Sequence, residues 1–338
     1  DVYQHKMKPT HDIVAFFAFI SFFPQLVAGP IEMATHLLPQ FLRSRSFDYA
    51  KATDGMRQIL WGLFKKLVIA DNCAVAVNQI FENYYQHDGL TLFYGAVLFT
   101  FQIYGDFSGY SDIAIGTARL FGINLMRNFN FPYFSRDIAE FWRRWHISLS
   151  SWLRDYLYIS LGGNRHGKFR QYLNLIITMF LGGLWHGASW NFVLWGMFHG
   201  VALALHKAWM TIIGRKKGEE SHGVRRFLGV IITFNFVCFC WIFFRNADIH
   251  NSMDMLGQIF TTFRPQLFPQ LLEGYWRVFA LMALGFLLHF APDSWENAVC
   301  RGVIRLPFLG KALLMVAMIY LVIQMKSSEI QPFIYFQF

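Results

Sequence analysis

The chain of 338 residues is 55% hydrophobic and 19% aromatic, and only 15% of its residues carry a charged side chain. Soluble domains carry charges on about a quarter of their residues, so the composition argues against a soluble protein. The formal net charge of +9 raises nucleic-acid binding as an alternative. The basic residues only separate apolar runs and form no domain of their own, so no nucleic-acid partner is expected.

Apolar runs recur along the chain, and several reach or approach the roughly 20 residues that a helix needs to cross a bilayer. We predict an all-α, polytopic transmembrane bundle that forms a single membrane domain over residues 1–338. Because the first residue is Asp1 and no signal peptide is recognisable, we expect the chain to lack helices that lie upstream in a longer protein. The apolar runs are residues 13–28, 90–103, 173–184, 192–213, 227–244, 278–290 and 312–323.

Charge placement indicates which loops face the cytoplasm. Residues 127–170 contain eight Arg or Lys against three acids, and basic loops beside spans mark the cytoplasmic side. The four cysteines form no Cys-x-x-Cys pair and are interpreted as small hydrophobic residues. A second basic cluster contains Arg215, Lys216, Lys217, Arg225 and Arg226.

A helical pattern over residues 54–81 is interrupted by Lys65 and Lys66. This helix is predicted to lie at the interface, or to tilt through the bilayer while its lysines reach the polar region. The Lys-Lys pair thus leaves two placements of the helix open.

Two carboxylates, Asp106 and Asp112, lie within or beside an apolar span in residues 104–116. Carboxylates at membrane depth are costly unless they are paired or hydrated. They are interpreted as a structural set of ion pairs and helix caps, or alternatively as a proton relay or a substrate contact. Their candidate partners are Arg119, Arg127 and the region of Arg143.

Residues 141–159 are predicted to form one amphipathic helix at the cytoplasmic interface, with His146 on the border between its faces. Arginines on its polar face are candidates for holding phosphates of a cofactor or of lipid head groups. The alternative is a lipid-surface helix with an idle histidine. The apolar stripe contains Trp142, Trp145, Leu149, Trp152 and Tyr156, and the polar face Arg143, Arg144, Ser148, Ser151, Arg154 and Asp155.

The most informative stretch is Leu-Gly-Gly-Leu-Trp-His-Gly-Ala-Ser-Trp-Asn over residues 181–191, which places His186 among Trp, Leu and Gly. Basic clusters flank residues 171–213, so we predict a hairpin that enters the membrane and returns, with its turn at residues 185–191. Irregular backbone at membrane depth must be buried or line a wet cavity, and His186 is therefore expected to face a cavity. The alternatives are a buried, hydrogen-bonded His and an interfacial loop in which Trp185 belongs to an aromatic belt.

Other chemistries have weaker support. The histidines form no metal-binding motif, and no Gly-x-Ser-x-Gly motif indicates a serine nucleophile, so no metal is expected. Ser189 and Asn191 are candidates for orienting His186 or a substrate. The aromatic C-terminus, residues 331–338, carries Tyr335, which is a candidate acyl acceptor or, as the favoured alternative, an interfacial anchor.

Together these stretches resemble the membrane-bound O-acyltransferase (MBOAT) family, in particular the bacterial branch that contains the alginate O-acetyltransferase membrane subunit. The resemblance covers most of residues 1–210 and the last few residues. It is carried by Ser-Phe-Phe-Pro-Gln-Leu-Val-Ala-Gly-Pro-Ile at residues 21–31, and by residues 104–116, 141–165, 181–200 and 333–338.

The resemblance implies a ring of tilted helices around a tunnel, in a multi-pass protein of the bacterial inner membrane. It implies that His186 matches the family's essential histidine, and that His146 matches a second position that is His or Asn in the family. We expect His186 to act as a general base and His146 to orient the donor or stabilise an oxyanion. The remaining substrate-binding candidates are Arg143, Arg144, Arg154, Trp185, Ser189, Asn191 and Asp106.

The implied reaction moves an acetyl group from acetyl-CoA or another cytosolic acyl thioester across the membrane, for O-acetylation of an exported polysaccharide such as alginate. Expected partners are a periplasmic acetyltransferase, the polysaccharide export machinery and membrane lipids. Alternatives within the family are D-alanyl transfer to teichoic acid and O-acetylation of peptidoglycan or cellulose. A different class is a proton-coupled transporter that uses Asp106, Asp112 and His186, although no inverted repeat supports it.

Overall fold

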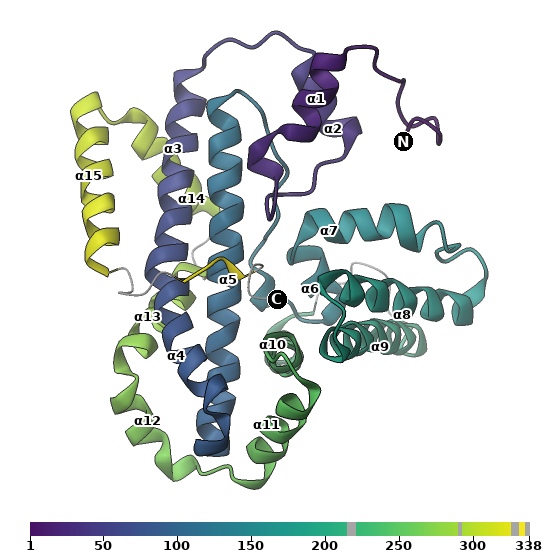
Figure 1. Ribbon diagram of the computed structural model, residues 1–338, viewed down its shortest axis with the longest axis vertical. Helices are drawn as coiled ribbons and strands as arrows, with labels where there is room; N and C mark the ends of the chain where they lie inside the picture. The colour runs from purple at the N-terminus through teal and green to yellow at the C-terminus, as the bar shows by residue number, and fades with distance from the viewer. Residues whose placement is uncertain (215–220, 290–292, 326–330, 335–338) are drawn as a thin grey trace. The chain divides into compact units, whose positions relative to one another are not determined.

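The computed structural model describes residues 1–214, 221–289, 293–325 and 331–334. Within these ranges all regular secondary structure is helical (Figure 1), which confirms the predicted fold class. The described residues group into two compact units, which are treated separately below. Unit 1 contains residues 1–72 and 103–128 and the described residues of 284–334, and unit 2 contains residues 73–102 and 129–283. The single membrane domain stays a prediction.

Unit 1 is built around α3 and the second part of α5, which lie side by side (Figure 1). Glycines allow this close approach: a Cβ on Gly55 would lie 2.7 Å from the Gly116 carbonyl oxygen, and one on Gly109 would lie 2.8 Å from that of Gly62. Small residues of this kind let helix backbones pack closely. The elements of unit 1 are α1(Ile13–Ser21), η1(Phe23–Gln25), α2(Ala34–Phe41), α3(Tyr49–Phe64), η2(Lys65–Ala70), α5(Gly89–Leu120) from Ile103, α14(Asp293–Arg305) and α15(Phe308–Met325).

The helical pattern of residues 54–81 is confirmed, and the two lysines coincide with a change in its geometry. A wider π-helical turn, η2, begins at Lys65 and joins α3 to α4(Asp71–Glu82) without a loop. Such π-turns often occur at functional sites. Here the turn directs Lys65 and Lys66 toward carboxylates of α5, with which both form ion pairs.

The first apolar run is not one continuous span. The helix α1 has nine residues and ends at Ser21, and Pro24 lies in the short helical turn that follows. Phe22 then packs into a small core with Leu37 of α2 and Ile115 of α5. The predicted run over residues 13–28 therefore folds as two short elements, because proline has no N–H with which to continue the hydrogen-bond ladder.

Within the described part of the chain, two helices are long and apolar enough to cross a membrane, α10(Gly223–Arg245) and α15, with mean hydropathies of 2.3 and 2.0. They confirm the runs at residues 227–244 and 312–323. Residues 265–274 and 276–288 together also pass this test, but they are bent by 92° and form either a broken span or a re-entrant pair. The runs at residues 90–103 and 173–184 lie within longer helices, and the run at residues 192–213 coincides with α9 as far as Ile212.

Unit 2 contains a helical hairpin formed by α8 and α9 (Figure 1). Glycines bring the two helices together, since a Cβ on Gly183 would overlap the Phe192 carbonyl oxygen, and one on Gly196 would lie 3.2 Å from the Cα of Gly183. This confirms a helical hairpin with its turn near the predicted residues, while its entry into the membrane stays a prediction. The elements are α4 from Cys73, η3(Tyr84–Gln86), the first part of α5, η4(Pro132–Phe134), α6(Ile138–Arg144), α7(Ile147–Trp152), η5(Leu153–Tyr158), α8(Gly167–His186), α9(Trp190–Ile212), α10, α11(Ile249–Thr261), η6(Pro265–Leu267), α12(Phe268–Gly274) and α13(Trp276–His289), the last from Trp276 to Ala283.

The prediction of one amphipathic helix over residues 141–159 is wrong. The helix α6 ends at Arg144, α7 begins at Ile147, and a π-helical turn follows from Leu153. Between α6 and α7, His146 adopts a left-handed backbone conformation with φ 43° and ψ 56°. The break rotates α7, so that Ser148 is buried although the helical pattern assigns it to the polar face.

Candidate active site

His186 is the last residue of α8, and its half-buried imidazole lies among aromatic rings. The ring centroids of Trp195 and Phe244 lie 5.2 and 5.0 Å from that of the imidazole, both nearly edge-on. The ring centroids of Trp185 and Phe192 lie 5.1 and 6.0 Å from that of His186, so four aromatic rings surround the imidazole. Gly187 and the Ser189 cap end α8 and start α9 here, so that the hairpin turn carries the histidine. His186 is thus partly open and fixed by its aromatic neighbours.

His146 is buried, with 4% of its surface exposed, and it lies close to His186 in the fold. The neighbouring Trp145 ring lies 5.2 Å from that of Trp241, which in turn lies 6.0 Å from that of Trp195, the ring beside His186. The His146 ring stacks on Phe129 at 6.4 Å, and its Nδ1 lies 3.4 Å from the Ser148 hydroxyl. Left-handed backbone costs a non-glycine residue about 1–2 kcal/mol, so packing must hold this conformation. The structure therefore brings together the two predicted catalytic histidines.

A third histidine, His199, belongs to the same aromatic cluster, and it was not among the predicted site residues. It is fully buried, one helical turn beyond Trp195, and their ring centroids lie 4.9 Å apart. The Trp142 indole N–H donates to its Nδ1 at 3.3 Å, while its Nε2 has no hydrogen-bond partner among the described residues. The spacing of Trp195 and His199 by four residues was the signal that could have found it.

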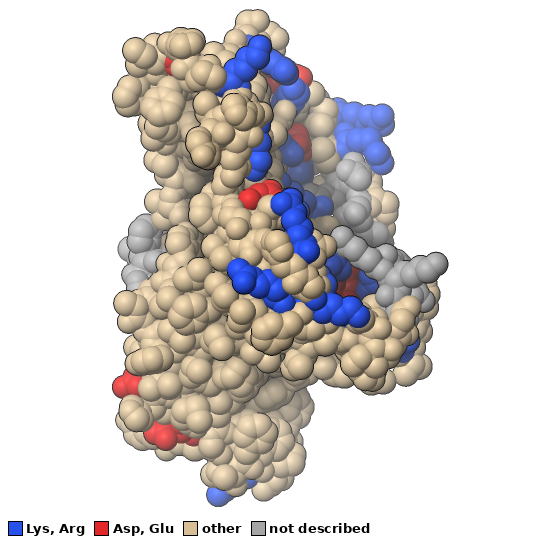
Figure 2. All heavy atoms as spheres, turned by 90° about the vertical axis from the view of Figure 1, so that its right-hand side faces the viewer, with Lys and Arg blue, Asp and Glu red and all other residues tan. Residues whose placement is uncertain are grey.

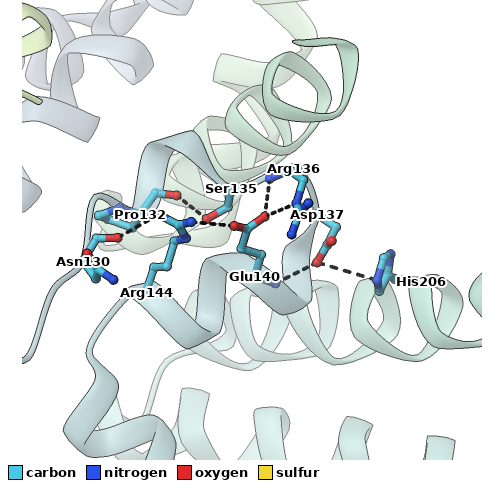
Figure 3. Close-up of polar contacts among 8 residues, drawn as sticks. All are labelled: Asn130, Pro132, Ser135, Arg136, Asp137, Glu140, Arg144 and His206. Carbon is cyan, nitrogen blue, oxygen red and sulfur yellow. Dashed lines mark hydrogen bonds and ion pairs between the residues drawn. The ribbon is translucent and has the colours of Figure 1, made fainter. Parts of the chain in front are cut away.

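The Arg144 side chain bonds to other groups of the protein. Its guanidinium pairs with Glu140 at 2.7 Å and also reaches the Asn130 carbonyl oxygen, while Arg136 pairs with the other Glu140 oxygen at 2.8 Å (Figure 3). Burial raises the pKa of the Glu140 carboxyl, but the hydrogen bonds and charges of Arg136 and Arg144 outweigh this effect and leave the pKa below its ordinary value. This cluster fixes α6, which directly precedes His146.

The other predicted arginines are exposed. Arg143 is exposed to solvent, and the exposed Arg154 forms a two-point contact with the neighbouring Asp155 at 2.6 and 2.9 Å. Figure 2 shows one face of the molecule, on which Lys and Arg side chains gather beside broad uncharged areas. The Arg143 guanidinium is therefore available to a phosphate-bearing ligand, whereas a phosphate would have to compete with Asp155 for Arg154.

The residues of the hairpin turn differ in what they can contact. Trp185 is 56% exposed, and the Ser189 hydroxyl accepts a hydrogen bond from the Asn191 backbone N–H as the cap of α9. Asn191 is fully buried, and its amide donates to the Asn246 carbonyl oxygen at 2.6 Å and accepts from the Ser252 hydroxyl at 3.3 Å. Both polar atoms of the Asn191 side chain therefore bond to the protein itself.

Asp106 lies in unit 1, whereas both histidines lie in unit 2. Its carboxylate is buried, pairs with Lys66 at 2.9 Å and accepts the Ile334 backbone N–H at 2.7 Å. Asp112 pairs with Lys65, so the interpretation of these carboxylates as ion pairs is confirmed, with lysines as partners where arginines were expected. Tyr335 lies outside the described residues. Among the residues described here, no three His, Cys, Asp or Glu side chains come together as metal ligands would.

Comparison with known sequences shows which protein family the chain matches. Residues 2–250 match the membrane-bound O-acyltransferase family, MBOAT. The chain is 37% identical to a protein named probable alginate O-acetylase AlgI from Pseudomonas putida, over 100% of the chain and 72% of the relative. It is 42% identical to a peptidoglycan O-acetyltransferase from Helicobacter pylori, over 70% of the chain and 45% of the relative.

A more distant relative, a teichoic acid D-alanyltransferase from Streptococcus thermophilus, is 30% identical over 68% of the chain and 60% of its own length. The chain spans about half the length of several other alginate O-acetylase relatives, for example 48% of the one from Pseudomonas aeruginosa. The family match covers both histidines, the α8–α9 hairpin and α10. The chain is a membrane protein, and it belongs to the membrane-bound O-acyltransferase family.

Proposed function

We propose that the chain carries the acyl-transfer site of an O-acetyltransferase, which passes an acetyl group from a cytosolic thioester such as acetyl-CoA to an exported polysaccharide. The observation that carries this proposal is that His186, at the end of α8, and His146, next to Trp145, belong to one cluster of packed aromatic rings. An imidazole can accept and return a proton near neutral pH, and aromatic walls hold its ring in one orientation. Membership in an acyltransferase family supplies the reaction class.

In the proposed reaction, His186 is the general base. An acceptor hydroxyl transfers its proton to the His186 ring as its oxygen attacks the thioester carbonyl carbon. The carbonyl oxygen then carries negative charge, and the C–S bond breaks to give an ester and a thiolate. The proton on His186 neutralises the leaving thiolate, so that the imidazole returns to its neutral state.

We assign His146 a different role in the reaction. Because it is buried and close to His186, it is suited to donate a hydrogen bond to the developing oxyanion or to orient the donor. Arg143 and Arg154 are exposed, and we assign them to the phosphates of the donor. Trp185 is placed beside His186 and would contact the acyl chain or acceptor. Arg144, Asn191 and Asp106 bond within the protein and are assigned supporting roles.

The acceptor is proposed from the relatives. Alginate is named for the relatives that cover the largest share of this chain, and peptidoglycan for another at similar identity. We therefore propose an exported polysaccharide, with alginate first, and with the inner membrane, the export machinery and a periplasmic acetyltransferase as its setting. D-alanyl transfer is less favoured because that relative is only 30% identical. A proton-coupled transporter is also less favoured, since the Asp106 and Asp112 carboxylates both form ion pairs with lysines.

The proposal is tested by replacing His186→Ala and measuring transfer of labelled acetyl from acetyl-CoA to polysaccharide in membranes. We expect transfer to fall by at least about 100-fold, the usual contribution of a general base. The matched control is His250→Ala, an exposed histidine near the start of α11 in the same unit. Equal amounts of monodisperse protein after detergent extraction establish folding. Transfer at the control's rate in the His186 variant would refute the proposed base.

A further inference from the structure

A buried cluster of charges in unit 1 contacts two backbone groups of the C-terminal segment Gln331–Ile334. The Lys66 ammonium lies 2.7 Å from an Asp71 oxygen and 2.9 Å from an Asp106 oxygen. Its third contact, at 3.3 Å, is the carbonyl oxygen of Gln331. An ammonium group has three N–H donors, so the C-terminal segment supplies the acceptor for the last of them.

Asp106 also has a hydrogen-bond partner in this segment. One carboxylate oxygen is used by Lys66, and the other accepts the Ile334 backbone N–H at 2.7 Å. Asp106 is 2% exposed and Ile334 is fully buried. Without the segment, one ammonium donor and one carboxylate oxygen would lose their partners. Groups left in that state are costly in a protein interior, so docking of the segment is coupled to the charge cluster.

Aromatic contacts add to the polar ones. Phe333 packs against Tyr110 with ring centroids 4.9 Å apart and lies edge-on to Phe107 at 6.3 Å, and both of these residues are on α5 with Asp106. Pro332 lies between the two anchored backbone groups, and its ring fixes one backbone angle of the segment. The segment is therefore held at Gln331 and Ile334 by charge and at Phe333 by packing.

We propose that Lys66, Asp71 and Asp106 form a recognition site for the segment Gln331–Ile334, and that Asp106 is a positioning residue that holds this segment in place for acyl transfer. The second part rests on the proposed function together with the prediction from the sequence that Tyr335, the next residue in the chain, is a candidate acyl acceptor. This recognition site, called the dock below, explains why two carboxylates surround one lysine. The Asp106 carboxylate accepts a charge-assisted hydrogen bond from the Ile334 N–H in addition to its ion pair with Lys66.

Hydrogen–deuterium exchange of the Ile334 amide in detergent micelles tests the dock. Asp106→Asn removes the charge but keeps Lys66 paired with Asp71, and we expect Ile334 to exchange about tenfold faster, as for loss of one charge-assisted hydrogen bond. Asp106→Leu also removes the acceptor and should accelerate exchange further. The matched control is Asp112→Asn, which removes a carboxylate from the other lysine pair of α5 and should leave Ile334 exchange unchanged. Unchanged exchange in both Asp106 variants would overturn the dock.

A double-mutant cycle separates docking from a merely structural role of Asp106. Asp106→Asn is combined with deletion of residues 331–338, and the thermal midpoint of each protein is measured. We expect the substitution to lower the midpoint more in the full chain than in the shortened one, where only the ion pair with Lys66 remains to be weakened. An equal loss in both would mean that Asp106 stabilises α5 independently of the segment, and would overturn the proposal.

Acetyl transfer tests the positioning role. We expect Asp106→Asn to lower transfer about tenfold while Asp112→Asn does not, with equal amounts of folded protein. Normal transfer with accelerated Ile334 exchange would overturn positioning. Failure of the proposed function is recognised separately: a fully active His186→Ala variant refutes the base, and the Ile334 exchange rates do not depend on that result.

Discussion

The close approach of α8 and α9 makes a quantitative prediction about Gly196. A Cβ at this position would overlap the Met179 carbonyl oxygen and lie 3.2 Å from the Cα of Gly183. Nonbonded heavy atoms prefer about 3.5 Å or more, so Gly196→Ala must push the helices apart by about 1 Å. Overpacking of this kind costs about 1–3 kcal/mol. Because Gly183 lies three residues before His186, the shift reaches the end of the hairpin.

A displacement of about 1 Å at a reacting group can cost about 100-fold in rate. We therefore expect Gly196→Ala to lower acetyl transfer by one to two orders of magnitude and to reduce the thermal midpoint. The control is Gly257→Ala in the middle of α11, where an added Cβ meets nothing within 4 Å. That change should be neutral or stabilise by up to about 1 kcal/mol through helix propensity. A Gly196→Ala protein as stable and active as the control would refute the close-packing argument.

Two other predictions concern the supports of the site. The lowered pKa of Glu140 means that its carboxylate contributes stability above its unfolded pKa of about 4.3, and that this contribution is lost as pH falls through the lower folded value. Glu140→Gln should thus lower stability at pH 7 by about 3 kcal/mol and weaken the loss of stability on acidification, measured by thermal unfolding between pH 3 and 7; an unchanged pH profile would contradict this. Asn191→Ala leaves the Ser252 hydroxyl and the Asn246 carbonyl without their partner and should destabilise by about 1–3 kcal/mol. If Asn191→Ala instead raises KM for the donor without loss of stability, Asn191 contacts substrate as the sequence first suggested.

Hydropathy and glycine placement were sufficient to predict the helical class and the α8–α9 hairpin. These features follow from local properties, namely long apolar runs and glycines on both sides of His186. The break between α6 and α7 was not predictable in the same way, because the residues around His146 have an unbroken helical pattern. Tertiary packing of Trp145 and Phe129 overrides that pattern here.

The roles of individual polar residues were harder to predict than their proximity. The sequence assigned Arg144, Asn191 and Asp106 to one group of substrate contacts, since each lies beside a histidine or in an apolar span. Their partners come from far along the chain, for example Asn246 for Asn191 and Ile334 for Asp106. A single sequence does not specify such pairs. His199 was missed for the same reason, since its surroundings come from α6, α9 and α10.

The left-handed backbone at His146 restricts which side chains this position accepts. Asparagine and glycine adopt that conformation readily, whereas alanine and β-branched residues do not. An exchange between histidine and asparagine here would therefore preserve chain geometry while altering proton chemistry. For the experimenter, glycine or asparagine is the informative replacement, because either one deletes the imidazole and nothing else, while an alanine scan would merge a lost function with a distorted loop.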